Sequence, residues 1–173
     1  KIDLQWDGSY RPGEGLGGTI RLSGQEITLA DAKGKGVLAD GTVRAVADLS
    51  GGNHVLREGA IGVEPDLKVS VSGELKRAFA PERSGSFRLT AGRTGLNALF
   101  DAFANRLPRP LQEATVGGEL TVDTTIRVTG RTSQVDGVLT LADAQLEVPG
   151  QKLLVSGVRG TLPFSLYPSG KGR

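Results

Sequence analysis

Apolar and polar residues alternate most regularly along residues 118–130. Every second position from 120 to 128 carries Leu, Val, Thr, Ile and Val in turn, and the positions between them carry Thr, Asp, Thr and Arg. A period of two is typical of a β-strand with one apolar face and one face in water. The same alternation recurs over 67–75 and 139–142, so the sequence predicts long strands with one apolar side.

Similar runs fill most of the chain, and turn residues separate them. Asp-Gly steps at 40–41 and 136–137 and a Pro-Gly step at 149–150 favour hairpins or turns. The step at 136–137 also fits a bulge inside one strand. The predicted fold class is therefore mainly β, a long, twisted antiparallel sheet. The segments expected to form its strands are 2–6, 18–23, 26–32, 36–40, 42–49, 55–63, 66–76, 84–91, 117–130, 134–142, 144–149, 152–157 and 159–167.

Residues 94–107 break the strand pattern. Thr94 is a suitable N-cap, and Pro108 and Pro110 prevent a helix from continuing. The segment predicts one amphipathic helix of about three turns, followed by a Pro-rich crossover that ends near 112. Such a helix either packs on the sheet as part of its core or closes one end of an open apolar trough. The apolar residues at helical spacing are Leu96, Leu99, Phe100, Phe103 and Leu107.

Length and composition favour a single β-rich domain over 1–173, with the helix and crossover at 94–112 between two strand-rich halves. Apolar residues make up 38% of the 173 residues, and 26 residues are glycine. That composition suits a sheet with many turns and little helix to cover it. Residues 1–6 already read as part of a strand, so we expect the chain to be a piece of a longer protein.

Charge and cysteine content narrow the function classes. The chain has no cysteine, which excludes a disulfide framework, a thiolate nucleophile and Cys-ligated metals. Its net charge is only +2, and no basic run with interleaved aromatic residues is present. Nucleic acid is therefore not an expected partner. A lack of cysteine also fits a bacterial periplasm.

Candidate catalytic chemistry is sparse. His54 is the only histidine, it follows a predicted glycine turn, and no nucleophile-elbow motif accompanies it. Gly13, Gly15 and Gly18 have the spacing of a dinucleotide-binding fingerprint, but a strand follows them where that fingerprint requires a helix. We therefore expect no enzyme activity, no catalytic residues, no cofactor and no metal site.

The C-terminal third carries the sequences VDGVLTLADAQLEVP at 135–149 and LLVSGVRGTL at 153–162. This pattern resembles the AsmA-like/TamB-like family of Gram-negative bacteria, including its YdbH and YhdP types. The resemblance is best over 115–166 and looser over 17–75, and it does not account for the predicted helix. It implies a periplasmic protein attached to the inner membrane, whose sheet folds into a half-pipe (a β-groove or taco-like shape) with an apolar interior.

The resemblance implies a function in lipid transport. Phospholipid acyl chains would lie in the apolar groove and pass between the inner and outer membranes. The implied partners are phospholipid, the inner-membrane anchor, further repeats of the same protein and an outer-membrane partner. Basic residues near the rim, such as Arg127, Arg131 and Lys152, would meet phosphate headgroups. The residues expected to line the groove are Leu67, Val69, Val71, Leu120, Val122, Ile126, Val128, Leu139 and Leu141.

Two other interpretations fit the same pattern. The apolar sides of the strands could close on each other as a sandwich or barrel core, giving a structural or adhesive module without a lipid ligand. Alternatively, Trp6 and Tyr10 could mark a carbohydrate-binding surface, which would require aromatic residues gathered on one flat face. The arrangement of the apolar sides separates these possibilities.

Overall fold

A computed structural model describes residues 1–12, 15–30, 36–63, 67–103 and 108–167. These residues form nine strands, two α-helices and a short 3₁₀ helix. The strands are β1 (Ile2–Arg11), β2 (Gly15–Ala30), β3 (Gly36–Ser50), β4 (Asn53–Val63), β5 (Leu67–Lys76), β6 (Ser84–Gly95), β7 (Thr115–Thr129), β8 (Thr132–Val148) and β9 (Leu153–Leu166). The helices are α1 (Leu96–Phe103), α2 (Arg109–Gln112) and the 3₁₀ helix η2 (Pro149–Gln151).

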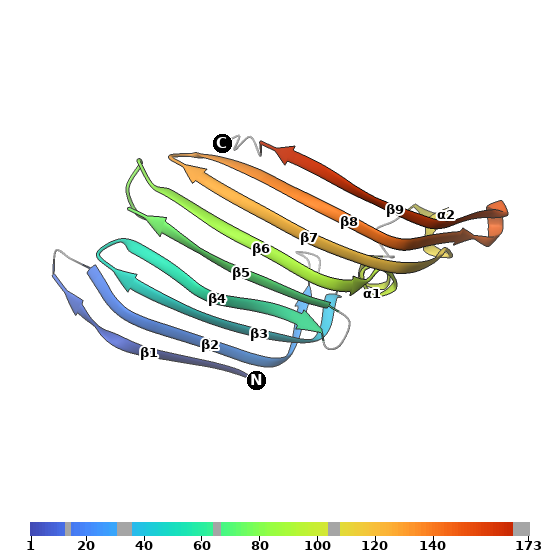
Figure 1. Cartoon of the computed structure of the whole chain (residues 1–173). Coiled ribbons are helices and arrows are strands. Elements are labelled where there is room, and N and C mark those ends of the chain that lie inside the picture. The colour runs from blue at the N-terminus through green and yellow to red at the C-terminus, as the bar shows by residue number, and fades with distance from the viewer. Residues whose placement is uncertain (13–14, 31–35, 64–66, 104–107, 168–173) are drawn as a thin grey trace.

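All nine strands belong to one antiparallel sheet, and their order in the sheet is their order in the chain (Figure 1). Each strand pairs with its neighbours in sequence, and β1 and β9 form the two edges. The sheet is open, neither closed nor curled. The predicted fold class is confirmed as mainly β, a long antiparallel sheet with one amphipathic helix. The half-pipe or taco-like shape that the resemblance implied is not formed by the described residues, because their sheet does not curl.

Several predicted strands are longer and continuous in the structure. Asp136 and Gly137 lie inside β8, where Gly137 pairs with Thr124 on β7 and Phe164 on β9. A Cβ atom on Gly137 would lie 2.5 Å from Cζ of Phe164 and 2.7 Å from Oγ1 of Thr124. The glycine therefore leaves room for a neighbouring ring and forms no turn. The irregularity in β8 falls later, near Asp143, whose φ is 50°.

The predicted helix is confirmed in its described part. Helix α1 begins at Leu96, two residues after the predicted N-cap, and residues 104–107 lie outside the described residues. Thr94 is still part of β6, and its hydroxyl donates to the Gly92 carbonyl oxygen at 3.0 Å, so the N-cap prediction is wrong. Helix α1 packs against β6 and β7 and reaches β3, at one end of the sheet (Figure 1).

Few side chains are buried in this architecture. Among the described residues, the buried apolar side chains are Ala91, Ala144 and Val148, and Thr94 and Thr124 are the buried polar ones. All five lie on β6, β7 or β8, and β6 and β7 also contact α1. A domain usually buries its apolar sides between two packed layers. Here the described residues form one sheet with a helix over a small part of it.

Candidate functional site: an open apolar face

Strand register places the predicted lining residues on one side of the sheet. Val122 on β7 lies opposite Ala91 on β6 and Leu139 on β8. Val71 on β5 lies opposite Leu89, two residues before Ala91. Partners across a ladder share a side, and so do alternate residues along a strand. We call this side the apolar face. It carries the whole predicted set, Leu67, Val69, Val71, Leu120, Val122, Ile126, Val128, Leu139 and Leu141.

The apolar face continues to both edges of the sheet. Leu4 on β1 pairs with Leu22 on β2, and Leu162 on β9 pairs with Leu139. Sequence reasoning missed these outer residues. Their apolar and polar positions alternate as they do in the central strands, but only the strand order shows that they extend the same face. At about 4.8 Å per strand spacing, nine strands make this face roughly 38 Å wide. Its additional apolar residues are Ile2, Leu4, Trp6, Ile20, Leu22, Val43, Leu49, Leu56, Ile61, Leu75, Phe87, Leu89, Val135, Leu162, Phe164 and Leu166.

Many of these side chains are in contact with solvent. Leu4 is 67% exposed, Ile61 is 44% exposed and Leu162 is 62% exposed. Soluble monomers rarely expose a continuous apolar surface of this extent, and such surfaces mark sites for apolar ligands, membranes or partner proteins. A sandwich or barrel core formed within the described residues is excluded, because all their strands belong to this one open sheet.

The opposite side of the sheet is polar and is crossed by ion pairs between neighbouring strands. The Arg88 guanidinium on β6 donates to both carboxylate oxygens of Asp123 on β7, at 3.0 and 2.6 Å. These hydrogen bonds lower the pKa of Asp123 below its ordinary value. Asp48 accepts hydrogen bonds from Thr19 and Arg57, which lower its pKa in the same way. This side is therefore suited to water.

Asp136 is the most connected carboxylate on the polar side. It accepts hydrogen bonds from Ser165 at 2.6 Å, Gln134 at 3.0 Å and Arg127 at 2.6 Å. The Ser165 hydroxyl has the largest effect, followed by Gln134 and Arg127, and together they hold the pKa of Asp136 below its ordinary value. The contacts join β7, β8 and β9 through one side chain.

The three predicted rim cations lie in different places. Arg127 points to the polar side, where it pairs with Asp136. Arg131 lies in the turn between β7 and β8, at one end of the apolar face. Lys152 lies between η2 and β9, at the other end of the sheet. The structure therefore does not bring these cations together.

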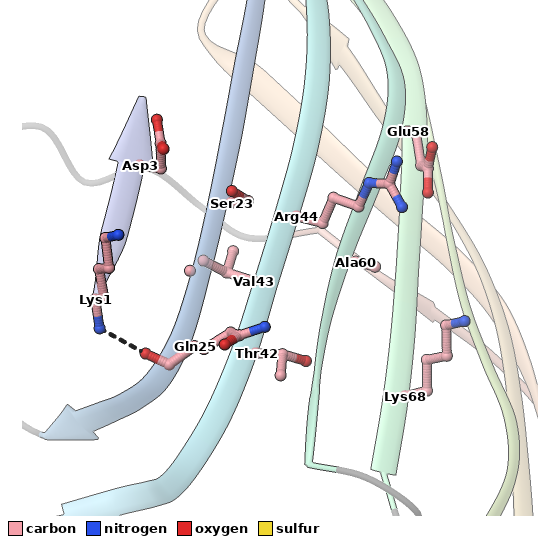
Figure 2. A pocket seen from close by; sticks show the side chains of 11 residues that line it. Lys1, Asp3, Ser23, Gln25, Thr42, Val43, Arg44, Glu58, Ala60 and Lys68 are labelled. Atoms are coloured by element: carbon pink, nitrogen blue, oxygen red, sulfur yellow. Dashed lines mark hydrogen bonds between the residues drawn. The ribbon is translucent and has the colours of Figure 1, made fainter. Parts of the chain in front are cut away.

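A shallow hollow of about 440 Å³ lies mainly on the polar side, across β1 to β5 (Figure 2). Its charged side chains have mixed signs, including Asp3, Arg44, Glu58 and Lys68, and they are spread around the hollow. The backbone nitrogen of Lys1 donates to the Gln25 carbonyl oxygen at 2.9 Å. This mixture favours no single class of charged ligand.

His54 and the N-terminal aromatic residues form no recognisable catalytic or sugar-binding arrangement. His54 lies at the start of β4, and its ring meets Phe79 edge-on, with centroids 5.4 Å apart. Trp6 and Tyr10 lie on the edge strand β1 and are both exposed. In the described ranges, no group of three or more His, Cys, Asp or Glu side chains could hold a metal ion.

No helix in the described part of the chain is long and apolar enough to cross a bilayer. Comparisons with protein-family models, with curated proteins and with solved structures found no match. The apolar face is therefore the feature from which we infer a function.

Proposed function

We propose that this chain is a lipid-binding segment that holds phospholipid acyl chains on its apolar face and contributes to lipid transfer between the inner and outer membranes. The observation that carries this proposal is the continuity of the face across all nine strands, with most of its described side chains still accessible to solvent.

Hydrocarbon chains suit such a surface because they need apolar contact and no directional partner. Each buried methylene stabilises the bound state by about 0.8 kcal/mol. An acyl chain that fills half of a bilayer's ~30 Å hydrocarbon core extends about 15 Å. The strands have 10 to 17 residues, or about 33–56 Å at 3.3 Å per residue. A chain could therefore lie along one strand and move between strands without breaking a specific bond.

The proposed setting follows from the resemblance to the AsmA-like/TamB-like proteins. In this setting the protein works in the periplasm of the cell envelope, attached to the inner membrane, and contributes to outer-membrane biogenesis. Further repeats of the same protein extend the surface toward an outer-membrane partner. The activity is transport, with no chemical reaction, cofactor or nucleic acid involved.

The first test compares two substitutions at neighbouring positions of β8. Leu139→Asp places a carboxylate on the apolar face, and Thr140→Asp places the same group on the polar side of the same strand. Native mass spectrometry with organic extraction would measure phospholipid that co-purifies with each variant. We expect near-stoichiometric lipid on the unchanged chain and on Thr140→Asp, and at least tenfold less on Leu139→Asp, because a buried charge is costly.

Circular dichroism provides the folding control. A β spectrum for both variants, with lipid lost only from Leu139→Asp, supports an acyl-chain surface. An unchanged chain that has no bound lipid and takes up no added fluorescent phospholipid would exclude the proposed function.

A further inference from the structure

We propose that one end of the apolar face binds the phosphate headgroup of an anionic phospholipid whose acyl chains lie on the same face. This inference rests on the proposed function and adds the headgroup class and the place where it binds. The site is the end of the sheet formed by the turns that join β3 to β4, β5 to β6 and β7 to β8, together with the neighbouring ends of β1 and β2 at Tyr10 and Leu16. We call it the arginine end.

The antiparallel topology brings these turns together. Residues 50–53, 77–83 and 130–131 all follow strands that run in the same direction, so they lie at one end of the sheet, opposite α1 (Figure 1). These turns carry Arg77, Arg83 and Arg131. In these three ranges Glu82 is the single acidic residue. The end is therefore basic, whereas the chain as a whole is close to neutral.

The first of two hollows at the arginine end measures about 590 Å³. Tyr10 and Leu16, which pair across β1 and β2, contribute apolar surface from one side, and Phe79, which is 87% exposed, contributes it from the other. Arg77 and His54 supply the polar groups. The Nε2 atom of His54 is buried and has no hydrogen-bond partner among the described residues.

The second hollow measures about 280 Å³ and repeats this combination. Leu75, Phe87 and Val128 line it from the apolar face, and Arg83 and Arg131 line it from the turns. Leu75 is the cross-strand partner of His54, so the two hollows adjoin. Both place guanidinium groups at the boundary of the apolar face.

The arginines at this end differ from those on the polar side in their partners. On the polar side Arg57, Arg88 and Arg127 each pair with an aspartate. Among the described residues, no ion pair is formed by Arg77 or Arg131, while the Nε atom of Arg83 donates to the Gly130 carbonyl oxygen at 2.9 Å.

A guanidinium group presents a planar set of donors that matches phosphate oxygens. Arg77, Arg83 and Arg131 lie at the end of an apolar surface, and none of them forms an ion pair with a described carboxylate. A molecule that joins one anionic phosphate to long hydrocarbon chains matches both parts of the site. Its phosphate would bind at the arginine end, and its chains would extend along the strands.

The test measures binding of two fluorescent phospholipids with identical acyl chains, phosphatidylglycerol and phosphatidylcholine. We expect the unchanged chain to bind the anionic lipid more tightly, with a preference that weakens as salt is added. The double variant Arg83→Gln/Arg131→Gln should bind phosphatidylglycerol about tenfold more weakly, since each basic residue near an anionic lipid contributes several-fold. Its affinity for phosphatidylcholine should not change.

The matched control is Arg88→Gln/Arg127→Gln, which removes two positive charges from the polar side. This variant should still bind phosphatidylglycerol more tightly than phosphatidylcholine.

Equal binding of both lipids by the unchanged chain, or an unaltered preference for phosphatidylglycerol in Arg83→Gln/Arg131→Gln, would overturn the headgroup inference and leave the acyl-chain proposal standing. Displacement of the anionic lipid by millimolar inorganic phosphate, with phosphatidylcholine still bound, would also overturn it, because the site would then be one for free phosphate. Failure to bind either lipid would exclude both proposals.

Discussion

Single residues stabilise the two sides of this sheet by different means. On the polar side, charged and hydroxyl groups connect neighbouring strands, as Asp136 does with Arg127 and Ser165. On the apolar face, cross-strand pairs such as Val122 and Leu139 contribute through contact area. The alternation that separates these two groups of residues could be predicted from the sequence, because it depends only on the period of a strand.

The ion-pair network predicts a dependence of stability on pH. The pKa of Asp136 is lower in the folded chain than its ordinary value of 3.8. Its contribution is therefore present above that value and is lost as the pH falls through the folded-state pKa. We expect Asp136→Asn to lower the free energy of unfolding at pH 7, and the difference from the unchanged chain to shrink as the pH falls below 3.8. Urea unfolding at a series of pH values measures this.

Asp101→Asn provides the comparison, since Asp101 is an exposed residue of α1 outside this network. It should unfold like the unchanged chain at every pH. A constant difference between Asp136→Asn and the unchanged chain from pH 7 to pH 2 would show that the carboxylate charge has no such role.

Some residue-level features could not be predicted because they depend on strand neighbours. Asp-Gly at 136–137 has the composition of a turn, yet Gly137 is required by the ring of Phe164 on the next strand. Arg127 and Arg131 are both basic residues near the end of β7, but one pairs with Asp136 and the other lies in the turn. The alternation along the strand places Arg127 on the polar side, but it does not show that Asp136 on β8 is its partner.

At the scale of elements, the positions of strands and of the helix were predictable, whereas their ends were not. Segments 134–142 and 144–149 are one strand because a bulge near Asp143 lets β8 continue. The described part of helix α1 spans eight residues, and isolated helices shorter than ~12–15 residues are marginal in water. Its half-buried side chains, including Leu99, therefore provide its stability by packing on the sheet.

This dependence predicts the behaviour of the helix when its packing is weakened. We expect Leu99→Ala to destabilise α1 by about 1–2 kcal/mol, less than the full cost for a completely buried leucine. Amide hydrogen exchange would then be faster over 96–103 and unchanged in β2 to β5. Asp101→Ala, at an exposed position of the same helix, should leave exchange unaltered. Faster exchange throughout the sheet would mean that α1 is part of its main cooperative unit.

The whole molecule has an unusual balance of surfaces, since one complete side of its sheet is apolar. Lipid-free chains are expected to cover that side by self-association, because apolar area removed from water contributes about 25 cal/mol per Å². Sedimentation velocity should show oligomers that increase with concentration and dissociate when phospholipid or detergent micelles are added. A lipid-free chain that stays monomeric at high concentration would contradict this expectation.

The order of the strands has a consequence for how the chain folds. Every strand pairs with the strands before and after it in sequence, so a newly synthesised strand always meets the edge formed just before it. Forming each new strand pair then costs little loop-closure entropy, because the two strands are neighbours in the sequence. Folding can proceed from one end of the sheet to the other, one hairpin at a time, with stability accumulating as a sum of neighbouring pairs.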